Sequence, residues 1–176
     1  HHFVSVRGVG LACTVNSQLR VFWQPAHEDV LEEDGRFEAS TETYRPLLRL
    51  LRRLAKEEAR VRLTMSLTPP LCAMLRDELL QQRYLRHLDR LIGLARQEIT
   101  RHRHHPPLLE LGHFYERFFT EARRFFADEL GQNVVRAFRD LQDAGVLEII
   151  ASAATHSFLP LLQHFPTAQR AQIRIG

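Results

Sequence analysis

Residues 61–71 have the sequence VRLTMSLTPPL, and this segment shows the cleanest strand pattern of the chain. Apolar and polar side chains alternate strictly from Val61 to Leu67, so the apolar ones share one face of an extended strand. The prolines at 69 and 70 end the pattern, because proline cannot donate a hydrogen bond within a sheet. The segment predicts a strand with one apolar and one polar face.

A second strand is predicted over residues 146–152, VLEIIAS, where helical periodicity gives way to a short apolar run. Several helical patterns separate it from the first strand. Two strands joined by so long a connection cannot form a hairpin, so they are expected to lie parallel. The chain is therefore predicted to be an α/β protein, rich in helix and with few parallel strands.

Apolar residues recur at helical spacing on both sides of the first strand. The predicted helices cover residues 40–58, 71–75, 79–99, 108–130 and 134–143, followed by a short helix ending at 162 and a last segment from 166. Residues 1–22 show only weak strand alternation, around 4–9 and 19–22. We treat 1–22 as an atypical N-terminal segment, for which a native, frame-shifted or vector-derived origin stays open.

The ends of these helices carry recognisable signals. Ser40 or Thr41 is expected to cap the first helix, with Pro46 in its first turn, where a missing N–H is not needed. Pro106 is expected to separate the two longest helices. Gly145 is expected to close the helix before the second strand in a left-handed conformation.

Composition narrows the functional classes. The chain has 176 residues, 44% of them hydrophobic and 26% charged, which is typical of a folded globular protein. The net charge is only +3, and the arginines alternate with acidic residues along helix faces, so a nucleic-acid partner is not expected. Lys56 is the sole lysine.

The cellular setting is predicted from three features. Cys13 and Cys72 lie far apart in unlike contexts, which disfavours a disulfide and favours a reducing cytoplasm. No run reaches the roughly 18 apolar residues of a membrane span, so no membrane partner is expected. The start His1-His2-Phe3 has neither a charged n-region nor a cleavable apolar stretch, so the chain is expected to be soluble and unexported. Because the first residue is histidine rather than methionine, we expect translation to begin upstream, the end to be processed, or the sequence to be partial.

The loop after the second strand, AATHSFLP over residues 153–160, holds the candidate site. Functional groups of α/β folds gather at the carboxyl ends of strands, which is where Thr155 and His156 fall. The alternative is that both residues merely cap the next helix. Glu148 lies within the strand and is expected to be partly buried; a structural hydrogen-bonding role is favoured over that of a general acid, because glycoside hydrolysis needs a second carboxylate.

Two other clusters are weaker candidates. His102, His104 and His105 could suggest a metal, but without Cys, Asp or Glu at ligand spacing they favour a solvated helix end, and no metal or cofactor is expected. The phenylalanines between 114 and 126 could form a lipid or sugar platform, but their helical spacing favours a core.

Four ordered segments resemble the α-glucan branching enzymes of glycoside hydrolase family 57. They are residues 31–48, with Phe-Glu-Ala and then Glu-Thr-Tyr-Arg-Pro-Leu, residues 63–71, LTMSLTPPL, residues 145–156, GVLEIIASAATH, and residues 170–174, RAQIR. The resemblance covers about residues 27–176. It implies that residues 23–176 are an incomplete N-terminal portion of a distorted, TIM-like (β/α)7 barrel acting on α-1,4-glucans such as glycogen or starch.

In that family a glutamate nucleophile and an aspartate acid/base carry out a retaining reaction. By the resemblance, the glutamate would follow soon after Gly176 and the aspartate much later, so the chain is expected to be inactive alone. The family's His-x-His-x-Pro motif does not precede Pro25. Gly35 stands where a large aromatic is common, and Ser157 where a glycine follows the matching histidine.

The resemblance carries over Thr155 and His156 as candidate substrate-binding residues and Glu148 as structural support, with none of them catalytic. Branching, hydrolysis and transfer stay open as activities of the complete protein. An open part of a barrel leaves apolar faces uncovered, so low stability or self-association is expected. The alternatives are a non-catalytic α-glucan-binding or interaction module and, last, an enzyme of the polysaccharide deacetylase type.

Overall fold

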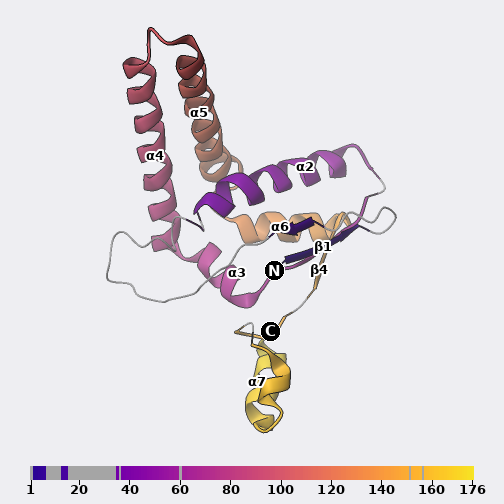
Figure 1. Cartoon of the computed structure of the whole chain (residues 1–176). Coiled ribbons are helices and arrows are strands. Elements are labelled where there is room, and N and C mark those ends of the chain that lie inside the picture. The colour runs from indigo at the N-terminus through magenta and orange to yellow at the C-terminus, as the bar shows by residue number, and fades with distance from the viewer. Residues whose placement is uncertain are drawn as a thin grey trace. The chain divides into compact units, whose positions relative to one another are not determined.

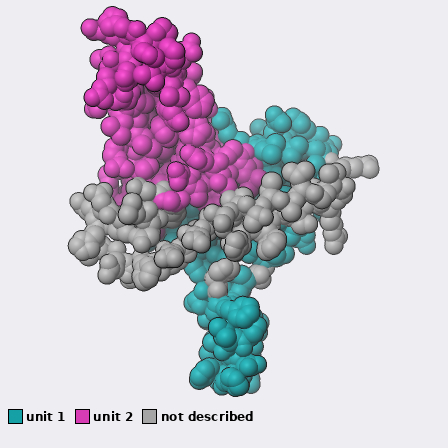
Figure 2. Space-filling model, in the orientation of Figure 1, with its two compact units in different colours: residues 1–18, 48–77, 135–176 teal, residues 19–47, 78–134 magenta. Residues whose placement is uncertain are grey.

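The computed structural model describes residues 2–6, 13–15, 35, 37–59, 61–150, 152–155 and 157–176 (Figure 1). The chain divides into two compact units (Figure 2). The first comprises residues 1–18, 48–77 and 135–176, and contains the sheet. The second comprises residues 19–47 and 78–134, and contains a long helical hairpin.

The sheet of the first unit has the strand order β2-β1-β3-β4. Its strands are β1 (His2–Val6), β2 (Cys13–Val15), β3 (Leu63–Ser66) and β4 (Leu147–Ile150). β3 and β4 are parallel, with Leu63 opposite Leu147 and Thr64 opposite Glu148. The predicted parallel pair with a helical crossover is therefore confirmed.

The N-terminal strands are antiparallel, unlike the parallel strands predicted over residues 61–67 and 146–152. β1 pairs antiparallel with both β2 and β3, with Ser5 opposite Thr64 in the second pairing. Only six residues separate Val6, at the end of β1, from Cys13, at the start of β2, which is too few for the crossover that a parallel pair needs. The expected strand at 19–22 lies outside the described residues. The described part of the chain is mostly helical with a small, partly parallel sheet and does not itself form a closed barrel.

β3 follows its sequence pattern closely. Leu63, Met65 and Leu67 are buried, whereas Thr64 and Ser66 are half-buried. Thr68 then caps α3 (Pro69–Arg76): its hydroxyl accepts a hydrogen bond from the Leu71 N–H at 3.4 Å. The two prolines occupy the first helical positions, where a backbone donor is not required. The sequence therefore encodes a strand that turns directly into a helix.

α6 (Val134–Asp143) leads into β4 through a glycine turn, as predicted. Gly145 has a φ of 73°, a conformation that costs glycine little. Its N–H donates to the Gln142 carbonyl at 2.9 Å, and the Val146 N–H donates to the Leu141 carbonyl at 3.2 Å, which together make a Schellman motif. The Val146 carbonyl then accepts from the Leu63 N–H at 2.9 Å, so the turn also sets the register of β4 on β3.

The first helical run begins earlier than expected. Phe37 to Ala39 are already helical, a π-helical turn η1 (Ser40–Tyr44) follows, and α2 (Arg45–Lys56) continues from it. The predicted cap at Ser40 or Thr41 is therefore wrong, because the Thr41 hydroxyl donates instead to the Phe37 carbonyl one turn earlier, at 2.8 Å. Pro46 lies inside the run, and the widened turn before it accommodates its missing N–H.

The second unit contains α4 (Glu78–Arg101), α5 (Pro106–Arg124) and the π-helical turn η2 (Phe125–Glu129). α4 and α5 lie side by side as an antiparallel hairpin, with Pro106 at the start of α5 as expected (Figure 1). The buried apolar side chains of this hairpin include Leu88, Ile92 and Ala122. Two ion pairs join the two helices, with Arg96 Nε at 2.7 Å from Glu116 and Arg123 Nε at 2.6 Å from Asp89.

The chain ends, within the first unit, in the 3-10 turn η3 (Leu159–Leu162) and helix α7 (Pro166–Ile175). None of the residues in these two elements is buried. Among the described helices, none combines the length and the apolar character needed to cross a bilayer.

Candidate functional site

The candidate site lies in the loop that follows the carboxyl end of β4. Residues 152–155 and Ser157 of this loop are described, whereas His156 lies outside the described residues. Thr155 itself is exposed, and its backbone and side chain face α7, which begins eleven residues later at Pro166. The position of Thr155 therefore depends on two elements, β4 and α7.

Thr155 is held by the side chain of Gln172 on α7. The Thr155 N–H donates to Gln172 Oε1 at 2.9 Å, and Gln172 Nε2 donates to Thr155 Oγ1 at 2.9 Å. The hydroxyl also lies 3.2 Å from Oε1, within donating distance. One amide side chain thus contacts both the backbone and the hydroxyl of the loop residue. The Thr155 hydroxyl does not cap η3, which has no side-chain cap.

Ser157 contributes the other described polar group of this loop. Its Oγ is buried and makes no hydrogen bond with any described residue. A hydroxyl in that state forfeits its hydration without compensation, which costs about 1–3 kcal/mol. This buried hydroxyl is next in sequence to His156, so a polar group is available beside the candidate histidine.

Glu148 supports the parallel strand pair but is not buried. Its Oε2 accepts a hydrogen bond of 2.8 Å from Thr64 Oγ1, and the two residues are opposite each other in the register of β3 and β4. The expected partial burial is wrong: Glu148 is exposed, as is Ile150 on the same face. β4 is the last strand of the described sheet, and that face of it is not covered by the described residues.

The histidines near 102 occupy a helix end, as expected. His102 Nε2 lies 3.1 Å from Glu98 Oε2, one turn back on α4, and His104 and His105 are exposed. No group of three or more His, Cys, Asp or Glu side chains with metal-binding geometry occurs among the described residues.

The phenylalanines of α5 and η2 divide into two groups. Phe125 and Phe126 are buried, so the predicted core role is confirmed for them. Phe114 is 51% exposed, so the same prediction is wrong there. Its ring stacks on Phe118 at a centroid distance of 6.0 Å. The helical spacing correctly grouped these rings, but it could not show which of them would be covered.

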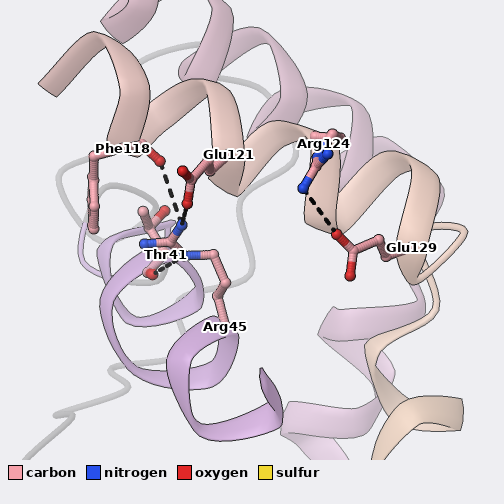
Figure 3. A network of polar contacts seen from close by, with 6 residues as sticks. All are labelled: Thr41, Arg45, Phe118, Glu121, Arg124 and Glu129. Carbon is pink, nitrogen blue, oxygen red and sulfur yellow. Dashed lines mark hydrogen bonds and ion pairs between the residues drawn. The ribbon is translucent and has the colours of Figure 1, made fainter. Parts of the chain in front are cut away.

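Arg45 is a buried arginine whose contacts with Thr41, Phe118 and Glu121 the sequence did not predict (Figure 3). It is only 8% exposed. Its Nε donates to the Thr41 carbonyl at 3.2 Å, and its Nη1 donates to the Phe118 carbonyl at 3.5 Å. Nη1 also lies 4.0 Å from the Glu121 carboxylate. The guanidinium lies 4.4 Å from the centre of the Phe118 ring. In the π-helical register, Thr41 would have accepted from residue 46, which is proline, so Arg45 supplies the missing donor.

The same part of the second unit contains two buried phenols. Tyr84 OH lies 2.8 Å from Thr41 Oγ1, and burial raises the pKa of Tyr84 to about 12 despite that hydrogen bond and the nearby Arg45 charge. Burial also raises the pKa of Tyr44 to about 12. Neither phenol is tuned toward neutral pH, which indicates a packing role.

Comparisons by sequence and by structure both identify branching enzymes as relatives, and the structural comparison adds an alpha-amylase. The chain is 30% identical over 145 residues to a 1,4-alpha-glucan branching enzyme of Thermococcus kodakarensis, a match covering 82% of this chain and 21% of that protein. Among solved structures, an alpha-amylase of Thermotoga maritima is 41% identical in sequence and matches with a TM-score of 0.76. The match covers 87% of this chain and 29% of the amylase chain. A family 57-type branching enzyme of Pyrococcus horikoshii shares 32% identity with a TM-score of 0.73, covering 81% and 26%.

The chain thus spans between 21% and 29% of the length of these relatives. A family model described as glycosyl hydrolase family 57 matches residues 21–176, nearly the whole of the chain outside its N-terminal strands. The ordered motifs, the parallel β3–β4 pair and the structural matches agree with that assignment. The chain belongs to glycosyl hydrolase family 57.

Proposed function

We propose that residues 21–176 are a substrate-contacting part of an α-glucan-acting enzyme, and that the 176-residue chain does not turn over glucan by itself. Thr155 and His156 contact the glucan, and Glu148 supports the strand that carries them. In the complete protein the reaction is a retaining one, used for branching, transfer or hydrolysis of α-1,4-glucan.

The observation that carries this proposal is the position of the polar loop. β3 and β4 are parallel, and Thr155 follows the carboxyl end of β4 within a family 57 match. In parallel α/β folds, ligands bind at that end of the sheet. The relatives named above are a branching enzyme and an alpha-amylase. An α-glucan is therefore the ligand class that this loop would meet.

The side chains of the loop suit a sugar. The Thr155 hydroxyl accepts from Gln172 Nε2 and keeps a second lone pair for a sugar hydroxyl, and a neutral histidine ring donates at one nitrogen and accepts at the other. Sugar hydroxyls need partners of both kinds. The proposed contact requires no metal and no cofactor.

Turnover requires more than this loop. A retaining glycosidase holds two carboxyl groups about 5–5.5 Å apart across the scissile bond. Glu148, the one carboxylate of β4, is exposed and accepts a hydrogen bond from Thr64. By the family resemblance the catalytic pair follows Gly176. We therefore assign Glu148 to strand support and expect no hydrolysis or transfer from the chain alone.

The test combines binding and turnover on the purified 176-residue chain. Co-sedimentation with glycogen is measured for the wild type, for His156→Ala, and for His164→Ala, an exposed histidine on the turn before α7 that serves as the matched control. The proposal predicts retention that His156→Ala weakens and His164→Ala does not, with no change in glucan chain length or branching. Turnover by the chain would refute the assignment of the catalytic groups elsewhere, and equal retention of both variants would refute the role of His156.

A further inference from the structure

We infer that Gln172 is a positioning residue that fixes Ala154 and Thr155 for glucan contact by the loop after β4, an inference that rests on the proposed function. Gln172 lies on α7, seventeen residues from Thr155 in sequence. Its amide contacts the Thr155 backbone at 2.9 Å and the Thr155 hydroxyl at 2.9 Å. No role for this residue follows from the sequence pattern of the loop alone.

The backbone of Gln172 holds the loop as well. Its carbonyl accepts a hydrogen bond of 3.0 Å from the Ala154 N–H and another of 3.2 Å from the Gly176 N–H. Residues 154 and 155 are therefore both fastened to one residue, by its main chain and by its side chain. Such a double attachment fixes the peptide units of residues 154 and 155, which immediately precede His156 in sequence.

Polar contacts dominate this attachment because α7 has no apolar anchor among the described residues. No residue of α7 is buried, and Ile173 and Ile175 are among the exposed large side chains. The hydrogen bonds of Gln172 therefore contribute directly to attaching this helix to the loop. Removing the Gln172 amide should therefore loosen the loop selectively.

Gly176 allows the close approach that these bonds require. A β-carbon at this position would collide with the Ser152 carbonyl oxygen and would lie 2.8 Å from the Ala154 nitrogen. Both are backbone atoms of the loop, so they cannot move aside as a flexible side chain could. The end of α7 thus sits directly against the loop that it positions.

The experiment uses the full 176-residue chain and two independent readouts. One is hydrogen exchange at the Thr155 amide, and the other is the Kd for maltoheptaose, a short linear α-1,4-glucan. Gln172→Leu removes both side-chain bonds, whereas Gln172→Glu keeps oxygen acceptors for the Thr155 N–H and hydroxyl. Gln169→Leu, one turn earlier on α7 and also half-exposed, is the matched control.

We expect Gln172→Leu to speed exchange at Thr155 and to weaken maltoheptaose binding, each by about fivefold or more, as loss of one or two hydrogen bonds implies. Gln172→Glu should restore both values close to the wild type, and Gln169→Leu should change neither. If Gln172→Leu unfolds the chain, Thr155→Val tests the contact by the exchange readout alone, because it deletes the hydroxyl half of the contact with Gln172 but also removes a proposed glucan contact.

The inference would be overturned by unchanged exchange at Thr155 in Gln172→Leu, by an equal effect from Gln169→Leu, or by no rescue in Gln172→Glu. Faster exchange with unchanged glucan affinity would also overturn it, by showing that the contact is only structural. If the wild type itself binds no maltoheptaose, the proposed function fails, and the exchange arm still decides whether Gln172 fixes the loop.

Discussion

The Arg45 guanidinium lies 4.4 Å from the centre of the Phe118 ring and also donates from Nη1 to the carbonyl of the same residue, at 3.5 Å. One side chain therefore joins the first helical run to α5 through a cation–π contact and a backbone hydrogen bond. Arginine suits this position because its planar fork donates in several directions at once. Lysine would keep the charge but lose that geometry.

Substitution of Arg45 should destabilise the second unit. Arg45→Ala removes the donors of two backbone carbonyls and the contact with Phe118, so we expect a loss of about 2–3 kcal/mol in the free energy of unfolding. Arg45→Lys should recover less than half of it. Denaturant unfolding followed by circular dichroism measures both. Arg53→Ala, an exposed arginine in α2, is the control and should change stability by less than about 0.5 kcal/mol.

The two buried tyrosines predict a loss of stability in strong base. Burial raises the pKa of Tyr44 and of Tyr84 to about 12 in the folded protein, whereas an unfolded phenol titrates near pH 10. The unfolded chain therefore releases these protons first. The stabilisation is fully present below about pH 10 and is lost as the pH rises from about 10 to 12, by about 2–3 kcal/mol for each residue.

Tyrosinate absorbance and circular dichroism, recorded together against pH, test this account. Tyr84→Phe should flatten the pH dependence of unfolding over that interval. An unchanged dependence in Tyr84→Phe and in Tyr44→Phe would show that these phenols do not control alkaline unfolding.

Two helical glycines of the hairpin should respond oppositely to alanine. A β-carbon at Gly93 meets nothing within 4 Å, so Gly93→Ala should stabilise α4 by about 0.5–1 kcal/mol through helix propensity. At Gly112 the β-carbon would lie 2.8 Å from Ile99 Cγ1, so overpacking should cancel or exceed that gain. Thermal unfolding of both variants, and of Gly112→Ala combined with Ile99→Ala, tests this. Equal stabilisation by both single substitutions would contradict the close helix contact.

Exposed apolar residues near the C-terminal helix predict self-association. Phe158, Leu161 and Phe165 are 68%, 75% and 64% exposed. Burying a large apolar side chain is worth about 1.5–3 kcal/mol. Burial of these three side chains between copies of the chain should therefore stabilise self-association. Sedimentation velocity over a range of concentrations should show association, which Phe158→Ser with Leu161→Gln reduces and Leu94→Gln on α4 does not. A monomer with a cooperative melt at every concentration would contradict this prediction.

The sequence was sufficient where a local rule decides the conformation. Alternation predicted β3, Gly145 predicted the turn into β4, and the length of the crossover predicted the parallel pair. The first two features follow from steric preferences within a few residues, and the third follows from the length of the connection between the two strands. The family motifs likewise lie in short contiguous segments.

The remaining features depend on partners distant in sequence. Arg45 lies in the Glu-Thr-Tyr-Arg-Pro-Leu segment, but its contacts with α5 come from residues more than seventy positions later in the chain. Gln172 and Thr155 meet only after α7 folds back on the loop. Glu148 was expected to be partly buried, but it is exposed. Strand periodicity predicts which face of the strand a residue occupies, but it does not predict what covers that face. The sequence therefore predicted the position of the loop, but not the Gln172 contacts that hold Thr155 in place.

The most direct test of the glucan-contact proposal is a titration of the isotope-labelled 176-residue chain with maltoheptaose, followed by amide chemical shifts. The account predicts shifts centred on residues 152–157 and on Gln172, with little change in the α4–α5 hairpin, and loss of the response in His156→Ala. Shifts confined to the hairpin, or a response that His156→Ala leaves intact, would contradict the assignment of the glucan contact to the loop after β4.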